Sequence, residues 1–241
     1  MKNKKIIFGI ALIVMAIVQV YAQQYTDEKE FVVRRIDGGK GVEITDYVGD
    51  GRIVNIPLQI QKMPVTRIGD MAFYGSDVFN ILIPDSVTSI GESAFEGCER
   101  LYILIIGNKL TSIGDRAFYG CTSLKDVDIP NGVTSIGKSA FEGCERLTLL
   151  TIGNKLTSIG YSAFYGCTSL KSVTIPNSVT TIEEAAFEEN QLTSITIPSN
   201  VLLKSNKFWC FSKGFDNCYE QNKKAGGTYI KDANNNWRKE K

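Results

Sequence analysis

Four cysteines of this 241-residue chain follow one another at a spacing of 23 residues: Cys98, Cys121, Cys144 and Cys167. Cysteine thiolates are metal ligands and redox groups, so this set invites a metal-site or disulfide-exchange interpretation. The regular spacing favours another one. If each cysteine occupies the same inward position of a repeated unit, it packs as a small hydrophobic side chain. We therefore expect a column of buried thiols.

Two further cysteines, Cys210 and Cys218, lie in an irregular C-terminal stretch, eight residues apart. An exported chain permits disulfides, and these two are the better candidates for one. The alternative is two unpaired thiols.

The carboxylates Asp126 and Asp128 would share one face of a strand, as a general acid/base pair or a calcium site would require. Calcium takes six or more oxygen ligands from several segments, and no loop here has that density. We interpret the pair as a solvated strand face. The chain has no histidine, which removes the commonest general base and metal ligand. We expect no enzyme activity, no cofactor and no metal.

The four periodic cysteines belong to a sequence repeat. The fragments VTRIGDMAF, VTSIGESAF, LTSIGDRAF, VTSIGKSAF, LTSIGYSAF and VTTIEEAAF recur every 22 or 23 residues. A fixed period in this range predicts a solenoid, in which each unit buries its apolar side against its neighbours. The phenylalanines that mark the period are Phe73, Phe95, Phe118, Phe141, Phe164 and Phe187.

One unit, residues 124–144, predicts the course of each coil. A short strand ends at Pro130, which cannot extend a paired strand, and a turn follows. A second short extended segment ends at Gly137, and we expect a helical or 3-10 turn after it. The side chains expected to face inward are Leu124, Val127, Ile129, Val133, Ile136, Ala140, Phe141 and Cys144.

The motif L-x-x-L-x-IP followed by VTSIG-x-x-AF-x-GC resembles the BspA-like leucine-rich repeat family, over residues 53–198. Both flanks also resemble that family's ends. The resemblance implies a leucine-rich-repeat solenoid, mostly β with short helical turns. We expect about six 23-residue coils with parallel stacked strands and β-hairpin caps. The resemblance also implies a secreted or surface-exposed protein that adheres to host proteins, matrix proteins or other cells, without catalytic residues.

The N-terminus predicts export. Residues 1–22 combine a lysine-rich start with an apolar run and small residues before Gln23, as a signal peptide does. The alternative is an uncleaved membrane anchor, although the run is short for a spanning helix. Cleavage would change the formal net charge from +1 to −2. We then expect an N-terminal cap over 23–60, the solenoid over 61–198 and a C-terminal cap over 199–241, with the protein secreted, at the cell surface or in the periplasm.

A second period lies on the first. Residues 85–130 and 131–176 are identical at 36 of 46 positions. The residue after each AF alternates, which predicts an outward column of Tyr74, Glu96, Tyr119, Glu142, Tyr165 and Glu188. Recent duplication of a coil pair explains this alternation, and a ligand-reading role of the tyrosines is the other interpretation.

The outward positions of the first strands are apolar, whereas those of the last strands are Ser and Thr. Contiguous exposed apolar surface usually marks an interaction site. The predicted protein-binding face is Phe79, Leu82, Tyr102, Ile103, Ile105 and Leu149. The alternatives are that the N-terminal cap covers these residues, or that drift after duplication left them apolar.

We therefore expect a non-catalytic, adhesin-like monomer that binds a host, matrix or cell-surface protein. It would not bind nucleic acid, because no basic field supports that, and would not insert into a membrane after signal cleavage. The alternative is a structural or spacer module of the cell envelope without a specific ligand.

Overall fold

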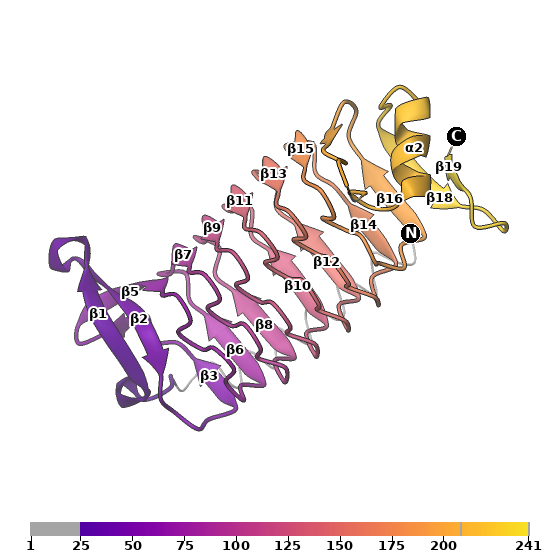
Figure 1. Cartoon of the computed structure of the whole chain (residues 1–241). Helices are drawn as coiled ribbons and strands as arrows, with labels where there is room; N and C mark the ends of the chain where they lie inside the picture. The colour runs from indigo at the N-terminus through magenta and orange to yellow at the C-terminus, as the bar shows by residue number, and fades with distance from the viewer. Residues whose placement is uncertain (1–24, 208, 241) are drawn as a thin grey trace, which may run out of the picture.

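The computed structural model describes residues 25–207 and 209–240, and the predicted signal peptide lies outside these residues. The described chain forms a β-solenoid of about seven stacked coils that extends as a rod between two caps (Figure 1). The predicted leucine-rich-repeat solenoid is confirmed, with about seven coils where the sequence indicated about six.

One side of the rod carries the first strand of each coil, and we call this side the long-strand ladder. Successive strands pair in parallel without slippage within each paired group, so that Val127 of one coil lies beside Leu150 of the next. The groups are β3-β6-β8, β10-β12 and β14-β16. These strands are β3 (Ile53–Asn55), β6 (Asn80–Ile83), β8 (Ile103–Ile106), β10 (Asp126–Ile129), β12 (Leu149–Ile152), β14 (Ser172–Thr174) and β16 (Ser194–Ile197).

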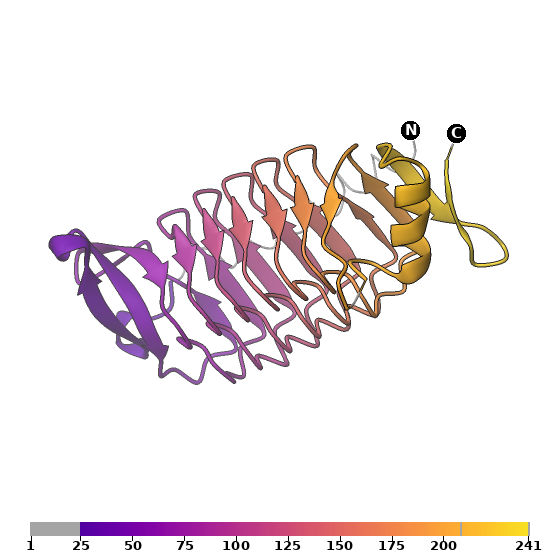
Figure 2. The same ribbon diagram turned by 45° about the horizontal axis from the view of Figure 1, so that its top comes forward.

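The second strand of each coil belongs to another ladder, which we call the short-strand ladder and which Figure 2 shows from another angle. Its register is also one coil per step, with Ile113, Ile136 and Ile159 side by side. Its strands are β5 (Met63–Ile68), β7 (Ser89–Ile90), β9 (Ser112–Ile113), β11 (Ser135–Ile136), β13 (Ser158–Ile159), β15 (Thr181–Ile182) and β17 (Leu202–Leu203).

The turn that follows each short strand keeps part of the 3-10 pattern that we expected and adds bonds between coils. Alternate N–H groups bond within the turn, as Glu142 N–H does to the Ser139 carbonyl at 3.2 Å, whereas those between them donate to the next coil, as Phe141 N–H does to the Ala163 carbonyl at 2.8 Å. Two residues of each turn have left-handed backbone conformations, here Ser139 (φ 54°) and Gly143 (φ 74°). The turn is therefore a third inter-coil ladder, because an α-helix would keep these donors within one segment.

The interior is a stack of phenylalanine rings. Phe118 and Phe141 have ring centroids 5.0 Å apart, and Phe141 and Phe164 have them 5.2 Å apart, with nearly parallel planes. The inward side chains predicted for residues 124–144 are all buried. The Phe column therefore forms the core along the whole solenoid.

The N-terminal cap is the β-hairpin that the sequence predicted. Strands β1 (Phe31–Ile36) and β2 (Gly41–Tyr47) pair antiparallel, and β2 continues the short-strand ladder by pairing with β5. Tyr47 stacks on Phe73 at 5.1 Å and so closes the first end of the core. The cap also contains η1 (Glu28–Glu30), η2 (Asp37–Gly39) and β4 (Gln59–Ile60).

The C-terminal cap closes the other end with aromatic rings. Phe211 stacks on Phe187 at 4.8 Å, and Phe215 packs against Phe211 from helix α2 (Lys213–Gln221). The predicted hairpin is present as β18 (Gly227–Lys231) and β19 (Trp237–Lys239), and β18 pairs antiparallel with β16. Helix α2 was not predicted, although Ser212 is a typical N-cap residue and accepts a bond from the Phe215 N–H.

Candidate functional site

The predicted protein-binding face lies on the long-strand ladder near its N-terminal end. Phe79 and Leu149 expose 43% and 54% of their surface, and the other four residues of the set are half-buried. Phe79 and Tyr102 stack on each other with centroids 5.4 Å apart. This stacking holds two large rings in place at the start of strands β6 and β8.

Strand alternation explains why Leu82, Ile103 and Ile105 point outward. Ile81 and Leu104 are buried in the core, so their neighbours on the same strands face the other way. The parallel register then places Leu82 beside Ile105 and Asn80 beside Ile103. Phe79, Leu82, Tyr102, Ile103 and Ile105 thus form one continuous surface, which we call the apolar patch.

Leu149 is separate from the apolar patch. It lies on β12, where its register partner is Asp126 on β10. The exposed strand β10, with Asp126 and Asp128, therefore stands between Leu149 and the isoleucines of β8. At about 4.8 Å per strand, Leu149 is about 10 Å from the patch.

One residue that we did not assign to this face extends it. Ile53 on β3 is the register partner of Asn80 and exposes 47% of its surface. The signal was present in the sequence, because Ile53-Val54-Asn55-Ile56 has the same outward and inward alternation as the later strands. We did not assign Ile53 to the face because the residues before it do not follow the repeat motif.

The N-terminal hairpin does not cover the apolar patch. Its inner strand β2 pairs with β5 of the short-strand ladder. The stretch before η1 approaches β3, where the Thr26 N–H donates to the carbonyl of Asn55 at 3.0 Å. The described structure therefore excludes the interpretation that this hairpin covers the apolar patch.

The acidic pair Asp126 and Asp128 is exposed on β10, as the strand-face interpretation requires. Asp126 accepts a hydrogen bond from the Thr148 hydroxyl at 3.4 Å, and partial burial raises the pKa of Asp128. Within residues 25–207 and 209–240, no three Cys, Asp or Glu side chains gather as a metal site would need.

The four periodic cysteines are buried thiols in one column, as predicted. Each also makes a contact that we did not foresee: its S–H donates to the carbonyl of a phenylalanine in the preceding coil. Cys121 Sγ lies 3.2 Å from the carbonyl oxygen of Phe95, and Cys144 Sγ lies 3.4 Å from that of Phe118. Burial raises the pKa of Cys121, Cys144 and Cys167 well above the ordinary value, which suppresses thiolate chemistry.

The last coil shows why a donor is needed in this column. It has Asn190 where the four preceding coils have cysteine, and the Asn190 side-chain amide donates to the carbonyl of Phe164 at 3.1 Å. This replacement was the sequence signal for a hydrogen-bonding role. In the C-terminal cap, Cys210 and Cys218 are free thiols that contact different carbonyls, those of Ile182 and Trp237, so the unpaired alternative is the one observed.

The thiol column makes a labelling prediction. At pH 8, a membrane-impermeant maleimide should leave Cys98, Cys121, Cys144 and Cys167 unmodified in the native protein, because they are buried and protonated. Cys218, which is half-buried, should be the first to react. Peptide mass spectrometry before and after denaturant would check this. Rapid native labelling at any of the four would contradict the burial of the column.

The comparisons with known proteins agree with this architecture. The family model of the BspA type leucine rich repeat region matches six copies over residues 54–155 and 144–223. The chain therefore belongs to the BspA-type leucine-rich repeat family. None of the curated proteins matches it.

Several solved structures are similar. A T. pallidum leucine rich repeat protein is 32% identical with a TM-score of 0.70, over 71% of this chain and 81% of that one. A leucine-rich repeat protein from Bacteroides ovatus is 29% identical, with a TM-score of 0.54, over 74% and 54%. A leucine rich cell surface protein from Faecalibacterium prausnitzii is 28% identical, with a TM-score of 0.55, over 88% and 59%. The chain thus spans a little over half of the last two proteins.

Proposed function

We propose that this protein is exported and binds a host, matrix or cell-surface protein through the apolar patch, without catalysing a reaction. The observation that carries the proposal is the patch itself: Phe79 stacked on Tyr102, with Leu82, Ile103 and Ile105 beside them on two paired strands. Large, partly desolvated side chains at the centre of a patch are typical of binding hot spots. A repeat scaffold presents such a surface along its side.

The internal duplication supports a role of the face beyond the fold. Residues 85–130 and 131–176 differ at ten positions, and none of these differences changes a core side chain. Five of the ten lie on the strand face: Tyr102/Thr148, Ile103/Leu149, Ile105/Thr151, Asp126/Ser172 and Asp128/Thr174. The two copies keep one interior and present different chemistry outside. Drift after duplication would also spare the core, so binding measurements decide between the two explanations.

One comparison and one prediction from the sequence support the proposed location. One similar structure is described as a leucine rich cell surface protein, and the predicted signal peptide would deliver the chain to the same side of the membrane. In the described part of the chain, no helix has the length and apolarity that crossing a membrane requires. BspA-type repeats are generally non-catalytic, which agrees with the proposed binding role.

The proposal predicts the effect of charging the patch. Ile103→Asp combined with Ile105→Asp should abolish saturable binding to an immobilised extracellular-matrix preparation, because two carboxylates would have to be desolvated at the interface. Surface plasmon resonance at physiological salt would measure this. A second variant, Ile103→Ser with Ile105→Thr, uses side chains already present at Ser172 and Thr174 and should weaken binding at least about tenfold.

The matched control is Ser172→Asp with Thr174→Asp, which places the same charges at the polar end of the same ladder and should bind normally. Circular dichroism should be unchanged in all three variants, because neither isoleucine belongs to the core column. Normal binding by both isoleucine variants would refute the proposal. Absence of saturable binding by the unmodified protein would favour the spacer alternative.

A further inference from the structure

The turn side of the rod contains a place where a glutamate and a tyrosine hold an arginine. Arg116 donates from Nε and Nη2 to the two carboxylate oxygens of Glu96, at 2.9 and 2.6 Å. Its guanidinium carbon also lies 4.3 Å from the ring centroid of Tyr119. A two-bond fork to a carboxylate combined with an aromatic contact is specific for a guanidinium, because a lysine ammonium cannot reproduce the planar fork.

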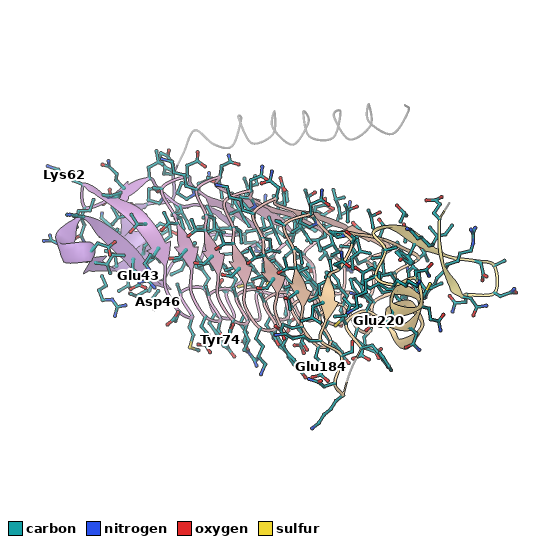
Figure 3. The ribbon with its side chains drawn as sticks, turned by 90° about the horizontal axis from the view of Figure 1, so that it is seen from above. Glu43, Asp46, Lys62, Tyr74, Glu184 and Glu220 are labelled. Atoms are coloured by element: carbon teal, nitrogen blue, oxygen red, sulfur yellow. The ribbon has the colours of Figure 1, made fainter. Side chains whose placement is uncertain are left out.

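The duplicated unit repeats this place without the arginine. Glu142 and Tyr165 correspond to Glu96 and Tyr119, but the residue that corresponds to Arg116 is Ser162. Both Arg116 (φ 54°) and Ser162 (φ 51°) have the same left-handed backbone conformation, so the two positions are equivalent in shape as well as in sequence. Tyr74 and Glu184 project from this turn side in Figure 3.

Where the arginine is missing, the surface is hollowed. An open pocket of about 390 Å³ is lined by Lys138, Ser139, Glu142, Tyr161, Ser162 and Tyr165. Tyr161 replaces the Asp115 of the first unit and adds a second aromatic wall. The Glu142 carboxylate makes no hydrogen bond or ion pair with the described residues, whereas Glu96 has both Arg116 and the Ser93 hydroxyl.

The charges around the pocket favour a cation. Besides burial, the negative charges of Glu189, Glu188 and Glu142 raise the pKa of Tyr165. Lys138 is the one cation in the pocket lining, and its ammonium lies over the Tyr161 ring, 5.3 Å from the centroid. Glu142 also contributes to the field at Arg116, but Arg116 gives its hydrogen bonds to Glu96.

We propose that the pocket between Glu142 and Tyr165 binds an arginine side chain presented by a partner protein. The contacts of Arg116 in the first unit serve as the model for this ligand. The partner's guanidinium would make a two-bond fork to Glu142 and lie against the Tyr165 ring. The site is on the turn side and does not depend on the apolar patch.

The test is a titration of the whole mature protein with N-acetyl-L-arginine amide, followed by the backbone NMR shifts of Ser139, Tyr161 and Tyr165. We expect one saturable site with a dissociation constant on the order of millimolar. N-acetyl-L-lysine amide should bind at least about fivefold more weakly, because it lacks the fork. Glu142→Gln should abolish binding. Glu96→Gln should leave it unchanged, and so should the charged-patch variant Ile103→Asp with Ile105→Asp, which separates this proposal from the proposed function.

Two exchanges between the duplicated units sharpen the test. Ser162→Arg should fill the pocket from within and abolish probe binding, whereas Arg116→Ser should open a second site and raise the stoichiometry from about one to about two. Both introduce a residue that the chain already carries at the equivalent backbone position, so the native spectrum should persist. No saturable shift with the arginine probe would overturn the proposal, as would equal binding of the two probes or binding that survives Ser162→Arg.

Discussion

Phe141→Ala should destabilise the solenoid by about 3–5 kcal/mol, as large-to-small aromatic changes in protein cores do. Phe141 has no exposed surface and stacks between Phe118 and Phe164. Its removal would leave a cavity in the middle of the ring column, and the coils above and below are held by three ladders that limit their collapse. Chemical denaturation followed by circular dichroism would measure the loss.

The control for this change is Lys155→Ala, an exposed position on a neighbouring coil. It should change the free energy of unfolding by less than about 0.5 kcal/mol. Comparable losses in the two variants would mean that the assignment of inward and outward positions is wrong.

Gly137→Asn should cost about 3 kcal/mol for a different reason, because the coils are stacked too closely there for a side chain. A Cβ atom at Gly137 would lie 2.5 Å from backbone atoms of Gly114 and Asp115 in the preceding coil. Backbone atoms cannot move aside as a flexible side chain can, so the coils would have to separate. Only the last full coil, next to the C-terminal cap, has another residue in this column, Glu183.

The same substitution at Gly120 is the matched control. Gly120 is left-handed (φ 68°), but a Cβ there would meet nothing within 4 Å. Asparagine tolerates that conformation, and the chain itself has Glu189 at φ 60° in the same column. We expect a cost below about 1 kcal/mol. If Gly120→Asn proved as costly as Gly137→Asn, backbone strain rather than coil spacing would explain both.

The periodic part of the fold could be predicted from the sequence because each coil repeats the same pattern of inward and outward side chains. The residue types of Phe141 and Cys144 recur at the same position in six and four units, so their inward direction is indicated several times over. Strand alternation likewise determined that Ile103 and Ile105 face outward. Continuity was harder to predict: Leu149 fits the same column, but the charged strand β10 separates it from the patch.

The features that periodicity did not reveal depend on contacts between coils. The turn around Ser139 has a helix-like sequence pattern, but every second N–H group donates to a carbonyl of the next coil, and these bonds depend on the stacking distance. The S–H bond of Cys121 and the pocket beside Glu142 also depend on how neighbouring coils stack. Helix α2 occurs once, in the aperiodic cap, where no second copy supports the pattern.

The central claim is that the apolar patch contacts a protein partner, and site-specific photo-crosslinking tests it most directly. A benzophenone amino acid placed at Tyr102, at the edge of the patch, should form a covalent adduct with a matrix protein on irradiation. The same group at Thr174, on the polar end of the same ladder, should not. An adduct that forms at Tyr102, is competed by unmodified protein and is lost in the Ile103→Asp and Ile105→Asp background is the predicted result. Equal crosslinking from both positions, or none from Tyr102 while the protein still binds the matrix, would contradict the account.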